Sequence, residues 1–186
     1  MNCLLNRLFV KNVARIAGII KNCRSKEMAR QIFYSFHYDN DVFRVQQIRN
    51  IGALEDNKPV SANEWETVKK GGDSAIEKWI DDNMKYRSCV VVLIGAKTAN
   101  RKWVKHEIQK AWKDGKGLLG IYVHNLSCPR NGKCSPGPNP FAQFTFKDGN
   151  GNVKSIPCKN PSSINAYNEI KDNLEDWIEE AIRNRS

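Results

Sequence analysis

The segment RKWVKHEIQKAWKDGK, residues 101–116, carries a carboxylate where a carboxylate is costly. Trp103 and Glu107 are four residues apart, so in a helix they share one face with apolar neighbours. A carboxyl group at the border of a buried face is unfavourable unless it is solvated, paired or used in chemistry. Arg101 or Lys105 could neutralise it, and the residues alone leave both interpretations open.

A second group of polar and aromatic side chains gathers where the first predicted strand, residues 30–36, ends. The group comprises Phe33, Tyr34, Ser35, His37, Tyr38, Asp39, Asp41 and Arg44. Core packing, helix capping or a loop position could account for each member, and their concentration at one strand end is the informative feature. Their loop contains no glycine, which excludes a phosphate-binding Walker loop and a dinucleotide fingerprint. No G-x-S-x-G nucleophile elbow occurs.

Strand and helix patterns alternate along the chain. The apolar run SCVVVLIGAKT, residues 88–98, is typical of a central parallel strand, and 117–125 is a second buried strand. Helices are predicted at 63–70, 73–84, 101–115 and 162–186, and from a cap at Asp39 or Asn40 through Arg49. This alternation predicts a parallel sheet with helices on both faces. Ligands of such folds bind at the carboxyl ends of the strands.

Two segments have a weaker pattern. Residues 126–162 are rich in proline and glycine and predict a long loop, with a short edge strand at 144–146 or 153–156. Residues 52–62 are irregular and polar, and we expect at most an edge strand near 58–61.

Residues 1–27 are basic, amphipathic and almost free of acidic side chains. They contain no small-residue cleavage site typical of a secretory signal. We expect them to be an N-terminal extension, either the product of an upstream start or an accessory helix. The functional domain is predicted to span residues 28–186.

The chain has 30 basic and 20 acidic residues, a net charge of +10. Outside residues 1–27 the charges are mixed, and no long basic tract indicates nucleic acid binding. The balance also suits a small anionic ligand such as a dinucleotide. No apolar run is long enough to span a membrane.

The six cysteines are scattered and form no C-x-x-C pair. We interpret them as free thiols of a cytoplasmic protein. A zinc site made of His124, Cys128, Cys134 and Cys158 is an alternative, but their spacing matches no common zinc pattern.

Several motifs together resemble the TIR domain, and most closely the TIR-like ThsB family of bacterial Thoeris anti-phage systems. They are IFYSFHYDND near the start, a WE-x-x-KK segment at 65–70, LIG followed by T-x-N-R-x-W-V-x-x-E-I at 93–108, and GPNPF at 137–141. The resemblance covers residues 29–141. It implies a flavodoxin-like α/β fold with a mostly parallel sheet between layers of helices.

The resemblance also implies an activity. Members of the family cleave NAD⁺ at the nicotinamide–ribose bond, and ThsB-type proteins cyclise the remainder to a cyclic ADP-ribose isomer that activates a separate effector. The catalytic glutamate of the motif falls on Glu107. We expect NAD⁺ as substrate, with no metal and no further cofactor.

Position assigns further roles within this expected site. Phe33, Tyr34, His37 and Trp103 would wall the substrate pocket, whereas Ser35, Asp41 and Arg44 would orient ribose or phosphate groups.

Three alternatives remain open on sequence grounds. The domain could be a non-catalytic adaptor that self-associates, or a nucleoside deoxyribosyltransferase, which shares the topology and a glutamate nucleophile. Separately, residues 1–27 could anchor the chain to a membrane or a nucleic acid. A phage-derived trigger and a homo-oligomer are possible partners under the signalling interpretation.

Overall fold

The sheet contains four parallel strands in the order β1-β2-β3-β6. The computed structural model describes residues 30–51 and 67–185. The strands are β1 (Ile32–Ser35), β2 (Cys89–Ile94), β3 (Gly117–Tyr122) and β6 (Cys158–Lys159). All six residues of β2 are buried, because β2 is a central strand with helices over both faces.

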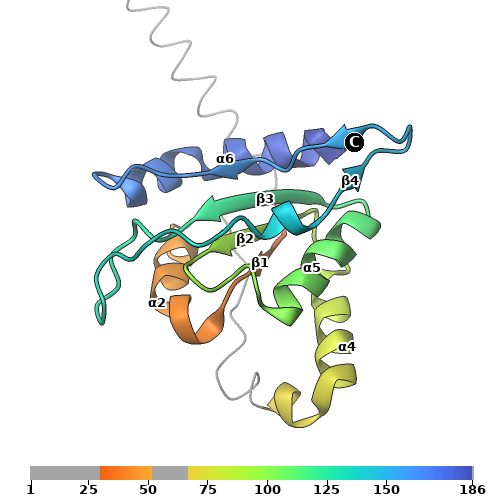
Figure 1. Ribbon diagram of the computed structural model, residues 1–186, viewed down its shortest axis with the longest axis horizontal. Helices are drawn as coiled ribbons and strands as arrows, with labels where there is room; N and C mark the ends of the chain where they lie inside the picture. The colour runs from red at the N-terminus through yellow and green to blue at the C-terminus, as the bar shows by residue number, and fades with distance from the viewer. Residues whose placement is uncertain (1–29, 52–66, 186) are drawn as a thin grey trace, which may run out of the picture.

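Helices cover both faces of the sheet (Figure 1). Helices α2 (Tyr38–Arg49) and α6 (Ala166–Arg185) pack on one face, and α4 (Gly72–Met84) and α5 (Lys102–Lys113) pack on the other. Alternate residues of β2 enter the two cores, as the period of two requires. The predicted three-layer α/β fold with a parallel sheet is therefore confirmed.

The start of α2 differs from the prediction. Neither Asp39 nor Asn40 caps this helix, because it already begins at Tyr38, with His37 in the N-cap position. The Asn40 amide donates instead to the carboxylate of Asp41 at 3.1 Å. The first turn of the helix is closed by a backbone hydrogen bond from Asp41 N–H to the carbonyl of His37.

The long segment after β3, which was predicted to be a loop, contains short strands and a 3₁₀ helix. An edge strand was predicted at 144–146 or 153–156. Strand β5 (Val153–Lys154) lies within the second range, whereas β4 (Phe146–Lys147) shares only Phe146 with the first, and the two strands pair with each other in a separate antiparallel ribbon. Strand β6 joins the main sheet and was not predicted, because two residues are too short to show a period. A 3₁₀ helix, η1 (Pro140–Gln143), precedes the ribbon and packs against α5.

Some predictions fall outside the described residues. These are the extension at 1–27, the edge strand near 58–61 and the start of the helix at 63–70, of which residues 67–70 are described and helical. Within residues 30–51 and 67–185, no helix is long and apolar enough to cross a bilayer.

Candidate functional site

A buried carboxyl–hydroxyl pair lies at the carboxyl end of β1. The face of α5 that packs on the sheet carries Glu107, and Ser35 is the last residue of β1. Ser35 Oγ donates a hydrogen bond to Glu107 Oε2 across 72 positions of sequence. Ser35 is 1% exposed and Glu107 is 9% exposed, so water reaches neither group freely. The hydrogen bond from Ser35 thus fixes the direction of the Glu107 carboxyl group at the carboxyl end of β1.

The electrostatics of Glu107 favour its neutral form. Burial raises its pKa from the ordinary 4.5 to about 8, and the Ser35 hydrogen bond acts in the opposite direction. Among the described residues, neither Arg101 nor Lys105 pairs with Glu107. The interpretation in which a neighbouring cation neutralises this carboxylate therefore has no support in the geometry. Strongly perturbed groups of this kind concentrate at functional sites.

Two of the predicted aromatic residues lie on the same face of the sheet as Glu107. Phe33 is buried and packs against Trp79 of α4, with ring centroids 6.3 Å apart. Trp103, in the first turn of α5, is half-buried in the same core and meets the ring of His106 edge-on at 5.9 Å. Tyr34 lies on the opposite face, against α2 and α6, because successive residues of a strand alternate. The structure therefore separates Tyr34 from the carboxyl group.

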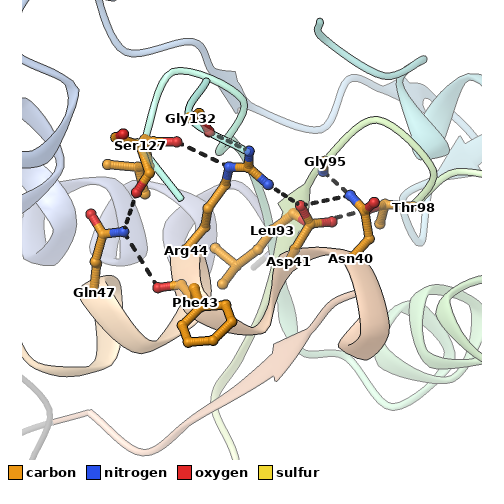
Figure 2. A network of polar contacts seen from close by, with 11 residues as sticks. Asn40, Asp41, Phe43, Arg44, Gln47, Leu93, Gly95, Thr98, Ser127 and Gly132 are labelled. Carbon is orange, nitrogen blue, oxygen red and sulfur yellow. Dashed lines mark hydrogen bonds and ion pairs between the residues drawn. The ribbon is translucent and has the colours of Figure 1, made fainter. Parts of the chain in front are cut away.

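Asp41 and Arg44 lie in a second polar network, at the start of α2 (Figure 2). Arg44 Nη1 contacts Asp41 Oδ1 at 3.1 Å. Arg44 Nε donates to the carbonyl of Leu126 at 3.0 Å, and Nη2 donates to the carbonyl of Gly132 at 2.8 Å. The guanidinium is thus engaged with the protein on three sides, whereas a substrate-orienting role was predicted for it.

The carboxylate of Asp41 is packed directly against Gly95, the residue after β2. A Cβ at Gly95 would lie 2.1 Å from Asp41 Oδ2, so only a hydrogen atom fits there. A Cβ at Gly137 would lie 2.1 Å from the carbonyl oxygen of Gly95. The first turn of α2, the end of β2 and the segment around Gly137 are therefore stacked in contact. Burial raises the pKa of Asp41, against the lowering effects of Asn40 and Arg44.

Two buried polar residues were not predicted as part of the site. Thr98 closes the turn after β2, where its Oγ1 accepts from Gly95 N–H at 3.0 Å. It stands within the 93–108 motif, which was the available signal. His124 follows β3, is almost fully buried, and burial lowers the pKa of its imidazole. Its position after a buried strand was the signal for it.

The predicted zinc alternative has no geometric support. Across residues 30–51 and 67–185, no three histidine, cysteine or acidic side chains are grouped so that they could hold a metal ion. The described cysteines are free thiols, namely Cys89, Cys128, Cys134 and Cys158.

Replacing Ser35 by Ala is expected to raise the pKa of Glu107 further, because the lost hydrogen bond stabilises the carboxylate form. Titration of the ¹³C-labelled Glu107 carboxyl by NMR would measure the shift. Ser88→Ala, which removes a hydroxyl bonded to the carbonyl of Gln31 before β1, is the control and should leave the titration unchanged. A Glu107 midpoint that falls in Ser35→Ala would contradict the assigned hydrogen bond.

Comparison with known proteins gives two matches. The family model described as "Thoeris protein ThsB, TIR-like domain" matches residues 33–127, which is 95 of the 186 residues. A curated protein of Bacillus cereus (strain MSX-D12), "Putative cyclic ADP-D-ribose synthase ThsB1", is 36% identical over 125 residues. That alignment covers 64% of this chain and 65% of the relative, so the chain spans slightly less than two thirds of the relative's length.

Proposed function

The chain belongs to the family of TIR-like domains of the Thoeris protein ThsB, and from this premise we propose that it cleaves NAD⁺ and cyclises the ADP-ribose part. The bond broken is the one between nicotinamide and ribose. The name of the 36% identical relative, a cyclic ADP-D-ribose synthase, supports the same chemistry. The observation that carries the proposal is the buried carboxyl group of Glu107, aligned by Ser35 at the carboxyl end of β1.

One carboxyl group suits this reaction. Glycosidases ordinarily use a second carboxyl group to protonate the leaving oxygen. Nicotinamide leaves the cationic NAD⁺ as a neutral molecule, so its departure requires no acid and no further cofactor. The ionised carboxylate of Glu107 would stabilise the positive charge that develops on the ribose. An internal nucleophile of the ADP-ribose part then bonds to the anomeric carbon and releases a proton.

The raised pKa of Glu107 suits a carboxyl group that is protonated in the resting protein and becomes ionised when a cationic substrate binds. In the resting protein the carboxyl group holds its proton up to about pH 8. The positive charge of NAD⁺ placed beside it would favour the carboxylate and lower its pKa. Burial also limits water, which would otherwise compete with the internal nucleophile and give linear ADP-ribose.

The proposed biological setting follows from the diffusible product. We place the reaction in the cytoplasm, where NAD⁺ is available, with a phage-derived trigger upstream and an effector that senses the cyclic product downstream. Assembly into a homo-oligomer belongs to the same proposal. Nucleic acid has no part in it.

Incubation of the concentrated full-length chain with NAD⁺, followed by mass spectrometry of small molecules, tests the function. We expect nicotinamide and a product with the mass of cyclic ADP-ribose. Linear ADP-ribose alone would indicate a hydrolase. The same assay in extracts of phage-infected cells detects an enzyme that needs a trigger, and intact NAD⁺ under both conditions would favour the non-catalytic adaptor.

A further inference from the structure

The proposed chemistry makes no use of the largest polar network at this edge of the sheet, the one centred on Arg44 (Figure 2). Arg44 is 2% exposed. Its donors hold two carbonyls of the segment 126–132, and the neighbouring Gln47 amide donates to a third, that of Ser127, at 2.8 Å. Helix α2 therefore holds this segment by its backbone, through contacts that do not depend on the side chains of the segment.

The other side of the network reaches the helix that carries Glu107. Asp41 accepts from Arg44 through Oδ1 and packs on Gly95 through Oδ2. Gly95 opens two consecutive turns: Thr98 N–H donates to the carbonyl of Gly95 at 3.4 Å, and Arg101 N–H donates to the carbonyl of Thr98 at 3.1 Å. Arg101 is the N-cap of α5.

A continuous series of contacts thus joins Arg44 to the start of α5. Glu107 lies on the second turn of that helix, with its hydrogen bond to Ser35 on the neighbouring strand. A shift of the turn at 95–101 would move this carboxyl group relative to Ser35. A mutation of this kind can cost about 100-fold in rate when it misplaces a reacting group by roughly 1 Å.

We propose that Arg44 is a positioning residue: through Asp41 and Gly95 it holds the turn at 95–101, and so fixes Glu107, while it also holds the segment 126–132 against α2. Arg44 does not bind the substrate phosphates in this scheme, since each of its three guanidinium nitrogens already donates a hydrogen bond to the protein and the side chain is buried. The mechanical part of the proposal is independent of the activity. Its catalytic consequence rests on the proposed NAD⁺ chemistry.

Hydrogen exchange of the full-length chain tests the mechanical part. In Arg44→Met, exchange at 126–132 and at 95–101 should both accelerate by about tenfold or more, because both segments lose their anchor. Arg44→Lys should restore part of the protection. Arg183→Met, at an exposed position of α6, is the control and should leave both segments unchanged. Acceleration confined to 126–132 would overturn the link to Glu107.

Asp41→Asn provides a second variant if Arg44→Met does not fold, because it keeps the shape of the side chain and weakens the pairing. It should accelerate exchange at 95–101 as well. Protection at 95–101 equal to that of the unmodified chain would again overturn the proposal.

Steady-state kinetics test the catalytic consequence at a temperature where the variants are folded. We expect kcat to fall by about 100-fold in Arg44→Met, with KM for NAD⁺ changed by less than about threefold. The share of linear ADP-ribose should rise, because a loosened edge admits water. A rise in KM with kcat preserved would identify Arg44 as a substrate ligand instead. If the unmodified chain has no turnover either alone or in extracts of phage-infected cells, the proposed function fails, and hydrogen exchange still tests the mechanical part of the proposal.

Discussion

Glu107→Gln is expected to abolish turnover of NAD⁺ and at the same time to make the protein more stable at pH 8. The substitution keeps the size of the side chain and its ability to accept from Ser35, but the amide cannot become anionic. Turnover should fall by about 100- to 1000-fold or more, the usual cost of losing a group that stabilises transition-state charge. Liquid chromatography of nicotinamide release measures this loss.

The gain in stability follows from the pKa of Glu107. In the folded protein this pKa is raised from 4.5 to about 8, so between these values the folded state holds a proton that the unfolded state has released. The free energy of unfolding therefore falls as pH rises through this window, by at most about 1.4 kcal/mol per pH unit. The amide in the Glu107→Gln variant does not titrate, so the free energy of unfolding of the variant does not fall in this window. The variant's free energy of unfolding should exceed that of the unmodified chain only slightly near pH 4.5. The difference should grow to a few kcal/mol at pH 8 and then level off.

Urea unfolding of both proteins at about pH 5, 6.5 and 8 measures how the free energy of unfolding changes across this pH window. Glu175→Gln, at an exposed position of α6, is the matched control and should follow the unmodified chain at every pH. Parallel curves for the unmodified chain and Glu107→Gln would mean that the carboxyl group titrates at its ordinary value. Loss of turnover together with a gain in stability would mark a residue whose burial serves chemistry rather than folding.

The strand and the helix that position Glu107 could be predicted, because their hydrophobic residues follow a clear pattern along the sequence. The apolar run of β2 and the helical period of α5 placed Glu107 at the border of the buried face of a helix that follows a central parallel strand. The partner of Glu107 was harder to identify, since Ser35 is 72 positions away and no period relates the two. Alternation along β1 could have shown that Tyr34 faces away from Ser35.

The role of Arg44 was not predictable in the same way. Two of its three partners are backbone carbonyls, of Leu126 and Gly132, in a segment whose regular structure is an isolated β-bridge between Cys128 and Gly132. Any residue offers a carbonyl, so the sequence of that segment carries no signal for the contact. From sequence alone, an arginine within this helix is therefore equally consistent with a ligand for phosphate and with a residue that holds a neighbouring segment in place.

Gly137→Ala is expected to lower the free energy of unfolding of the protein, because the added methyl group has no space. A Cβ at this position would lie 2.1 Å from the carbonyl oxygen of Gly95 and 3.0 Å from its carbon. These atoms belong to the backbone, so no side-chain rotation can relieve the contact. Separation of the two segments should cost about 2–3 kcal/mol, as in other overpacked sites. Urea unfolding measures the cost.

Gly149→Ala is the matched control for this experiment, because a Cβ there has no neighbour within 4 Å. Neither glycine has a left-handed φ, so both substitutions are free of backbone strain and differ in the space available. The control should change the free energy of unfolding by less than about 0.5 kcal/mol. Equal stability of the two variants would show that the segment around Gly137 can lift away from Gly95 without loss. In that case the close contact with Gly95 would not explain why the GPNPF motif has a glycine at position 137. The packing of the three segments against one another would then not be what fixes the position of the segment around Gly137.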